Sequence, residues 1–591
     1  MRRIFTLLLT VSLLVVALVV LASCGKATEG LEFYEYGDGY SVGISDGKYL
    51  DKIVIPKEHE GKKVVAIAKK GFLGCENAVT ISLPNTITEI GEGAFQNCYK
   101  LEEIELPNGV KSIDKQAFKG CKALTSITIT DGVTSVGELA FSNCRALRSV
   151  TISNTVTELG NNAFEGCIAL TSITIPSSVT SIGEGIFTGC TALTNISVDE
   201  SSRSYKSIDG NLYTKDGASF IQYALGKKEF EFVAPDTVTS VGAYAFAGNT
   251  ALTKITLPGT VTKVGDKAFD DCPIENATVP VCAIKEISQD NLKIIEINGG
   301  DAISKNAFRN SQLLKRVTIS GVKEIGDSSF YNCVSLREVT IGEGLEKIDE
   351  YAFKGCVYLS DISLPDSLKE IGANAFKDCN RLTKIVIPLN VEEIGMYAFE
   401  GCASIRLYCR TAKAPEGWNK WWSENTNSKY TITWGYMVDM NAAEMDIPLY
   451  DENGLTENTF NIADNKNGVT VITFWGTWCE PSLALLPDLD RLATEHDGKI
   501  KVLAIHTNGL STPALEYINE NFPDSKILFG RDLPNSSGKL TDPEEYYSLM
   551  GGFEGTYPIT LVVDQNGVIT AHYVGAFEYS VLNSDIKKLL K

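Results

Sequence analysis

Residues 163–183 read AFEGCIALTSITIPSSVTSIG, and close variants of this stretch recur every 23 residues through much of the chain. Within it, Ile173 and Ile175 alternate with Thr174, which is the period-two pattern of a short strand with one buried face. Pro176 follows directly and cannot donate to a strand ladder, so it ends the strand. The stretch therefore predicts one short strand in each repeating unit.

The same unit carries a second apolar spacing. Phe164, Cys167 and Leu170 lie three residues apart, which suits a helical or 3₁₀ turn on another side of the coil. A coil of this length cannot bury its apolar side alone and must stack on its neighbours, and the period is typical of leucine-rich repeats. We therefore expect a β-rich solenoid over residues 65–406.

The repeat pattern is disturbed in two places. Two Asp-Gly turn signals, at residues 209–210 and 216–217, lie between apolar stretches and predict a β-hairpin insertion near residues 199–230. The regular rhythm returns at Ala245 and loosens again over residues 272–307, where the sequence assigns no coil.

Most of the 15 cysteines belong to the repeats. In an exported protein this number would ordinarily suggest disulfides. Their equal spacing indicates otherwise, because each occupies the same place in a repeating unit, and we interpret the column as small apolar core residues. The equally spaced cysteines are Cys75, Cys98, Cys121, Cys144, Cys167, Cys190, Cys333, Cys356, Cys379 and Cys402.

Composition argues against several classes of function. The chain has 591 residues, which is too long for one hydrophobic core, and a net charge of −20. This charge leaves no basic stripe for a phosphate backbone, so we expect no nucleic-acid partner. The four histidines are scattered without the spacing of zinc ligands, and we expect neither a metal site nor a cofactor.

The first residues predict export. Met1–Arg3 is a positively charged start, and residues 4–20 are almost entirely apolar. The sequence LASC at residues 21–24 resembles the lipobox of bacterial lipoproteins, in which the cysteine thiol is acylated. The resemblance implies a signal peptide over residues 1–23, a lipid anchor on Cys24 and an extracytoplasmic location at the cell surface. The alternative is an uncleaved signal anchor, which would also leave the bulk of the protein outside the cytoplasm.

The repeats resemble a known class. Their AF-x-x-C and IG-x-x-AF elements are similar to BspA-like leucine-rich repeats, which occur in surface proteins of bacteria and some protists. The resemblance implies an N-terminal tether and cap over residues 24–64, repeats over residues 65–406, and a C-terminal cap over residues 407–436. The aromatic residues that carry the resemblance in the C-terminal cap are Tyr408, Trp418, Trp421, Trp434 and Tyr436.

The outward positions of the predicted strands form two rows. The first is rich in hydroxyl side chains, which is mostly a β-propensity pattern, and contains Ser82, Glu105, Thr128, Thr151, Thr174, Ser197, Thr256, Thr318, Thr340, Ser363 and Val386. The second is mixed in charge and includes Glu103, Lys254, Arg316, Glu338, Asp361 and Lys384. The ligand of a solenoid depends on such exposed side chains. The resemblance implies a protein or glycan partner on this surface, and a passive spacer is the alternative.

A different pattern follows the repeats. The β-rich residues 469–474 lead into WGTWCEPS at residues 475–482 and then into the apolar, helix-compatible residues 483–492. A second strand is predicted at residues 500–505, and GTYPITLVVDQNG follows at residues 555–567.

These two motifs resemble the TlpA/ResA-like branch of thioredoxin-fold oxidoreductases over residues 447–591, after a linker at residues 437–446. The resemblance implies that Cys479 is the attacking cysteine at a helix N-terminus, where partial positive charge lowers the pKa of a thiol. It also implies that Pro558 is the cis-proline facing Cys479. The further substrate contacts that it implies are Trp478, Glu480, Pro481 and Tyr557.

Two departures from the family pattern limit the chemistry. Ser482 stands in place of the second, resolving cysteine, and its hydroxyl can donate to a thiolate but cannot resolve a disulfide. Leu485 stands where the family tends to place a glutamate, before a proline that matches Pro487. Three interpretations stay open: a monothiol oxidoreductase or isomerase, a degenerate thioredoxin fold kept for binding, and a purely structural role for Cys479.

The sequence thus predicts a multidomain protein, a β-rich leucine-rich-repeat solenoid followed by an α/β thioredoxin-like domain. We expect a membrane-anchored, extracytoplasmic lipoprotein with a protein or glycan ligand on the solenoid and a thiol-containing protein as substrate of the second domain. The alternative is a non-catalytic surface adhesion or binding protein with a degenerate thioredoxin fold.

Overall fold

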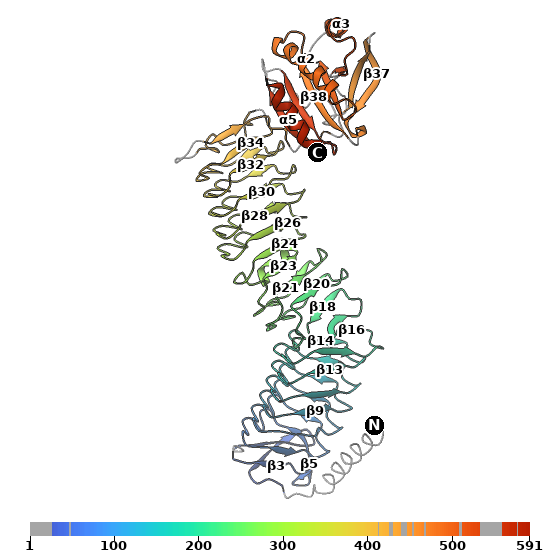
Figure 1. Ribbon diagram of the computed structural model, residues 1–591. Helices are drawn as coiled ribbons and strands as arrows, with labels where there is room; N and C mark the ends of the chain where they lie inside the picture. The colour runs from blue at the N-terminus through green and yellow to red at the C-terminus, as the bar shows by residue number, and fades with distance from the viewer. Residues whose placement is uncertain are drawn as a thin grey trace. The chain divides into compact units, whose positions relative to one another are not determined.

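The computed structural model describes most of the chain (Figure 1). The described residues are 27–45, 49–411, 413–424, 430–438, 442, 446–451, 454–465, 468–506, 511–531, 558–575 and 577–590. They fall into two compact units, which divide in the sequence between Val322 and Lys323. Cys24 and the apolar run before it lie outside the described residues. Among those that are described, no helix has both the length and the apolar character needed to cross a bilayer.

The first unit starts with a small antiparallel cap. β1 (Leu31–Tyr36) and β2 (Gly39–Ile44) form a hairpin, and β2 pairs in parallel with β5 (Lys62–Ile67). β4 (Glu58–His59) pairs antiparallel with β5. β5 then pairs with β7 (Glu89–Ile90), so the cap leads directly into the stacked coils.

Each regular coil has three sides. The first carries the predicted strand: in β13 (Ser172–Ile175), Ile173 and Ile175 are buried, and the strand pairs in parallel with β15 (Asn195–Val198). The second side carries a strand of only two residues, such as β14 (Ser181–Ile182). Sequence analysis did not predict this strand, because two residues cannot show an alternation. The third side consists of turns.

The two kinds of strand form rows through the first unit (Figure 1). The first-side strands are β3 (Lys52–Val54), β6 (Thr80–Ser82), β9 (Ser126–Ile129), β11 (Ser149–Ile152), β13, β15, β19 (Glu231–Val233), β21 (Lys254–Thr256), β23 (Asn276–Val279), β24 (Ile294–Ile297) and β26 (Arg316–Ile319). The second-side strands are β7, β8 (Ser112–Ile113), β10 (Ser135–Val136), β12 (Glu158–Leu159), β14, β18 (Ser219–Gln222), β20 (Ser240–Val241), β22 (Lys263–Val264) and β25 (Ala302–Ile303). Neighbouring strands within a row pair in parallel wherever a pairing is formed.

The turn side carries the Phe-Cys-Leu spacing. In the coil of β13, the Cys167 N–H donates to the Phe164 carbonyl at 3.3 Å, and the Leu170 N–H donates to the Cys167 carbonyl at 3.1 Å. These i to i+3 bonds have the geometry expected of a 3₁₀ turn. They do not continue as a helix, because Asn162 and Gly166 have positive φ angles of 54° and 68°. The third side is therefore a series of separate turns.

Phenylalanine rings and cysteine thiols fill the interior. From Phe72 to Phe187, the rings of successive coils stack with centroids 5.1 to 5.8 Å apart. The thiols donate to phenylalanine carbonyls of the preceding coil, as Cys144 does to Phe118 at 3.2 Å. Burial raises the pKa of the Cys144 thiol to about 12. The interpretation of the repeat cysteines as small core residues is confirmed for this column.

The Asp-Gly pairs lie at the turns of an antiparallel meander. β16 (Tyr205–Ile208), β17 (Asn211–Thr214) and β18 pair in succession. Asp209 and Gly210, between the first two strands, have φ angles of 50° and 73°, the left-handed conformation that a two-residue hairpin turn requires. β18 then pairs in parallel with β20 and returns the chain to the second-side row.

One coil departs from the repeat. Between β23 and β24 the chain forms the 3₁₀ helix η1 (Val281–Glu286) where other coils have a second-side strand. As a result, β22 ends one sheet and β25 begins another. This coil lies in residues 272–307, where the sequence assigned none.

The second unit begins with further coils of the same kind. Its first-side strands are β28 (Glu338–Ile341), β30 (Asp361–Ser363), β32 (Lys384–Ile387), β34 (Arg406–Cys409) and β35 (Thr431–Thr433). Its second-side strands are β27 (Glu324–Ile325), β29 (Lys347–Ile348), β31 (Glu370–Ile371) and β33 (Glu393–Ile394). The rings from Phe330 to Phe399 stack at 5.1 to 5.5 Å, as in the first unit.

Tryptophan rings close this stack. Trp422 packs edge-on against Phe399 at 6.2 Å and against Trp418 at 4.8 Å, and the indole N–H of Trp418 donates to a backbone carbonyl at 3.0 Å. Trp434 lies 5.9 Å from Trp418. The sequence singled out Trp421 for this cap, but Trp421 is exposed and the buried ring belongs to Trp422.

The rest of the second unit is an α/β domain. A seven-stranded mixed sheet has the order β37-β36-β40-β39-β38-β41-β42. Its strands are β36 (Asp446–Asp451), β37 (Gly454–Asn461), β38 (Val469–Trp475), β39 (Ile500–His506), β40 (Leu528–Arg531), β41 (Ile559–Val563) and β42 (Ile569–Val574). The helices are η2 (Ile462–Asp464), α2 (Glu480–Glu495), α3 (Ser511–Asn521) and α5 (Tyr579–Leu589). The predicted fold class, a β-rich solenoid followed by an α/β domain, is confirmed.

β38 is an inner strand of this sheet, between β39 and β41, and all of its residues are buried. Its side chains alternate between two apolar clusters, as expected when both faces of a sheet are covered. Val471 belongs to the cluster that includes Leu486 of α2, and Phe474 belongs to the other. Met437 and Ala442, from the segment expected as a linker, are buried in the same cluster as Phe474.

Candidate functional site

The candidate site is the connection between β38 and α2. Cys479 is the N-cap residue of α2: its N–H donates to the Gly476 carbonyl at 3.0 Å, and its own carbonyl accepts from the N–H groups of Ser482 at 3.0 Å and Leu483 at 3.1 Å. The side chain is therefore attached at the positive end of a 16-residue helix. Such a position favours the thiolate form of a cysteine.

The residues around Cys479 differ sharply in exposure. Cys479 is only 8% exposed, whereas Trp478 is 55% exposed, and Glu480 and Pro481 are exposed as well. A Cβ at Gly476 would lie 2.7 Å from the Trp478 ring, so this glycine allows the indole to lie against the backbone. The thiol thus lies at the base of a surface formed by the predicted substrate contacts of the motif.

Ser482 lies one helical turn after Cys479. It is 1% exposed, and among the described residues its hydroxyl oxygen has no hydrogen-bond partner. A buried hydroxyl without a hydrogen-bond partner lowers the stability of the folded state. Leu485 is buried in the cluster that contains Leu486 and Leu489, so this position contributes to the core and offers no proton acceptor.

Sheet register brings Pro558 to the same edge. β41 runs antiparallel to β38 with Phe474 opposite Ile559, so Pro558 lies at the end of β38 from which the chain continues to Cys479. Pro558 is buried, and its carbonyl accepts from the Gly575 N–H at 2.7 Å. Tyr557 lies outside the described residues. The register thus places Pro558 and Cys479 at the same edge of the sheet.

His506 was not singled out by the sequence analysis. It is the last residue of β39, is 1% exposed, and pairs in register with Trp475. The ring centroids of Trp475 and His506 are 5.1 Å apart at 70°. The signal in the sequence was weak, because a histidine that ends an apolar strand is most often part of the core. Its position on the edge that also carries Cys479 makes it a candidate neighbour of the site.

Metal binding finds no support in the described part of the chain. No group of three or more histidine, cysteine, aspartate or glutamate side chains there is arranged to hold an ion.

The strand faces of the coils form the second candidate surface. Thr128 and Thr174 of the hydroxyl row are exposed. Part of the charged row is paired within the chain, since Lys254 Nζ lies 2.8 Å from a Glu231 carboxylate oxygen. Lys384 lies over two tyrosine rings at 5.7 Å. The surface is thus polar and contains fewer unpaired charges than the sequence suggested.

Sequence comparison identifies relatives of both parts. The profile of the BspA type leucine rich repeat region matches residues 46–167, 111–215, 222–298 and 301–408. A thioredoxin-like protein, YneN of Bacillus subtilis, is 30% identical over 115 residues, which are 20% of this chain and 61% of that protein. Thioredoxin of Staphylococcus saprophyticus is 34% identical over 79 residues, which are 12% of this chain and 76% of that protein. The chain thus spans less than two thirds of the Bacillus relative.

Among solved structures, a leucine-rich repeat protein from Bacteroides ovatus is similar with a TM-score of 0.47 and 26% identity, covering 69% of this chain and 99% of that one. The profile matches cover more than half of the 591 residues, and they coincide with the coils described above. The chain belongs to the BspA-type leucine-rich repeat family, and its second unit carries a thioredoxin-like domain.

Proposed function

We propose that the protein is an extracytoplasmic lipoprotein, anchored through Cys24, whose solenoid binds a protein or glycan partner and whose thioredoxin-like domain performs thiol-disulfide exchange with Cys479 alone. The observation that carries the enzymatic part is the placement of Cys479 at the N-cap of α2, one turn before the buried hydroxyl of Ser482, which has no hydrogen-bond partner within the described part of the chain. Anchoring and location are supported by residues 1–24 and by family membership.

The proposed reaction is a two-step exchange. The Cys479 thiolate attacks a disulfide of a partner protein, forming a mixed disulfide and releasing one partner sulfur as a thiolate. A second thiolate, from the substrate itself or from an external thiol, then attacks the partner sulfur of the mixed disulfide and releases Cys479. Cys479 is the only cysteine in residues 447–591, so resolution within this domain is excluded. Ser482 would donate a hydrogen bond to the thiolate in both steps.

The pH dependence of Cys479 alkylation tests this proposal. In the full-length protein, alkylation of the peptide that contains Cys479 is followed by mass spectrometry from pH 4 to 10, with Cys479→Ser as the blank. An apparent pKa clearly below the ordinary thiol value of about 8.5 supports an activated thiolate. An ordinary or raised value, or no alkylation of the folded protein, would leave a binding role in its place.

The second candidate function is a non-catalytic surface binding protein. It is favoured by Ser482 in place of a resolving cysteine and by the packing of Leu485 in the core. The Cys479→Ser variant distinguishes the two functions. If Cys479→Ser leaves every measurable function of the protein unchanged, the domain serves binding alone.

The proposed role of the solenoid needs its own test. Lys254, Arg316 and Lys384 are replaced together by glutamine, and binding of the full-length protein to cells and to extracellular matrix is measured. Loss of binding supports contact through the strand faces, whereas unchanged binding contradicts it. The triple variant of Lys111, Lys122 and Lys215, which are exposed and lie outside the first-side strands, controls for the loss of three positive charges.

A further inference from the structure

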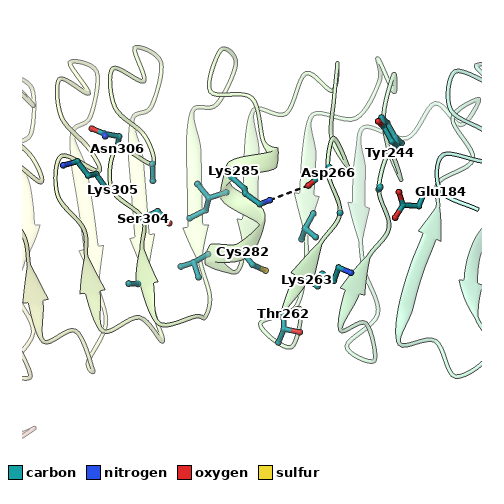
Figure 2. A pocket seen from close by; sticks show the side chains of 17 residues that line it. Glu184, Tyr244, Thr262, Lys263, Asp266, Cys282, Lys285, Ser304, Lys305 and Asn306 are labelled. Atoms are coloured by element: carbon teal, nitrogen blue, oxygen red, sulfur yellow. Dashed lines mark ion pairs between the residues drawn. The ribbon is translucent and has the colours of Figure 1, made fainter. Parts of the chain in front are cut away.

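The irregular coil borders a hollow of about 870 Å³ in the first unit (Figure 2). Its walls come from η1, from β22 and β25, and from the residues that follow β14, β20, β22 and β25. A hollow of this size is typical of a small-ligand site. It lies where η1 interrupts the second-side row of strands, between β22 and β25.

The η1 wall is fixed in place. One carboxylate oxygen of Glu286 accepts a hydrogen bond from the Lys267 N–H at 2.7 Å. The other oxygen of the same carboxylate lies 3.0 Å from Lys285 Nζ. The Cys282 thiol donates to the Val261 carbonyl at 3.4 Å. Contacts on both ends of this short helix hold it against the preceding coil, so binding requires little ordering of the wall.

Positive charge gathers around the hollow. Lys263, Lys285 and Lys305 line it from three different segments, as the sticks in Figure 2 show. Counted with Glu184 and Asp266, the lining has a net charge of +1, whereas the chain as a whole has a net charge of −20. The arrangement of the lysines favours a ligand with at least one negative charge.

The same hollow also carries two carboxylates, which would repel a ligand whose only polar groups are anionic. Glu184 and Asp266 contribute carboxylates to the lining, and Asp266 lies 3.8 Å from Lys285. Carboxylates accept hydrogen bonds from ligand hydroxyls and repel ligand carboxylates. Asn306 adds an amide and Tyr244 a half-buried aromatic ring. A ligand that fits must therefore combine a carboxylate, several hydroxyl donors and an apolar ring face.

We infer that the hollow beside η1 binds a short acidic oligosaccharide, with the sugar carboxylate near the lysines and sugar hydroxyls donating to Glu184 and Asp266. The inference rests on the proposed binding role of the solenoid and adds to it a place and a chemical class of ligand. An acidic peptide would satisfy the lysines, but its carboxylates would meet Asp266 and Glu184 unfavourably.

Calorimetry on the full-length protein in detergent tests the inference with two probes that each carry a single carboxylate, 3′-sialyllactose and 6′-sialyllactose. Lactose, which lacks the sialic acid, is the neutral control. We expect at least one acidic sugar to bind, and the double variant Lys263→Gln/Lys305→Gln to bind it about tenfold or more weakly, because charge-assisted hydrogen bonds are lost. Lys347→Gln is the matched control, since Lys347 begins the two-residue strand β29 as Lys263 begins β22. This control should bind normally.

Asp266→Asn separates the two ligand classes. It should weaken the binding of the acidic sugar, whose hydroxyls lose an ionised acceptor, and strengthen the binding of a glutamate-rich peptide, which loses a repelling charge. Three results overturn the inference: neither sugar binds, the lysine double variant binds as the wild type does, or the peptide binds more tightly than both sugars. If these occur while cell or matrix binding persists, only this inference fails. If cell and matrix binding are absent as well, the proposed binding role fails with it.

Discussion

Replacing Ser482 with alanine should stabilise the thioredoxin-like domain and at the same time make Cys479 less reactive. The hydroxyl is buried and has no hydrogen-bond partner among the described residues. A buried polar group without a partner lowers the free energy of unfolding by about 1–3 kcal/mol. Alanine is also a better helix former than serine by about 0.5 kcal/mol. The small void left by the oxygen offsets part of this gain, so we expect a net increase of about 1 kcal/mol in the free energy of unfolding.

The assay must report on this domain alone, because a chain with several units does not unfold in one two-state step. Hydrogen exchange of peptides from β38 and α2 in urea gives the local free energy of opening. Ser580→Ala is the matched control, since Ser580 is an exposed serine near the start of α5 and should change stability by only a few tenths of a kcal/mol.

Two results would refute the reasoning about Ser482. A loss of stability in the alanine variant would mean that the hydroxyl has a strong partner in the folded protein. An increase in stability with an unchanged alkylation rate of Cys479 would mean that the hydroxyl does not assist the thiolate. We expect greater stability together with lower reactivity, which is the usual trade-off between stability and activity at a functional site.

The remaining predictions concern the core and the response to pH. Phe141→Ala should destabilise the first unit by about 3–5 kcal/mol, because the ring is fully buried and stacks on rings 5.2 and 5.5 Å away; urea unfolding compared with the exposed Leu73→Ala checks this. Cys144 should resist alkylation until the unit unfolds, since burial raises its pKa to about 12. Alkylation of Cys144 in the folded protein as fast as that of an exposed thiol would contradict this prediction. Burial lowers the pKa of His572 to about 4, so between about pH 6.5 and pH 4 the unfolded chain binds the proton that the folded domain refuses. Stability should therefore fall as the pH is lowered through this range, and His572→Gln should flatten the decline measured by thermal unfolding.

The regular coils could be predicted from the sequence because their determinants are local and repeated. The alternation of Ile173, Thr174 and Ile175 predicts a strand at β13, and equal spacing predicts that the cysteines share a column. The two-residue strands could not be found this way, since a strand such as β14 has no period to measure. Its existence depends on the neighbouring coils with which it pairs.

The irregular parts depend on contacts that no local pattern encodes. Trp421 and Trp422 are adjacent and chemically equivalent, and only the geometry of the cap decides that the second is buried. The helix η1 replaces a strand in one coil. Lys263 and Lys305, which line the hollow beside it, are more than 40 residues apart in the sequence. At the candidate site, the motif predicted the helix N-terminus at Cys479, but the pairing that brings His506 next to Trp475 depends on the sheet.

The stacked phenylalanines have a consequence for how such a chain can change in length. The Phe118 and Phe141 rings lie 5.2 Å apart at 2°, and the Phe353 and Phe376 rings lie 5.4 Å apart at 5°, so coils far apart in the sequence offer nearly the same surface to their neighbours. A coil copied or deleted as a whole would meet a matching partner on either side. The gene can therefore lengthen or shorten the array by whole coils through unequal recombination, without a new interior having to evolve.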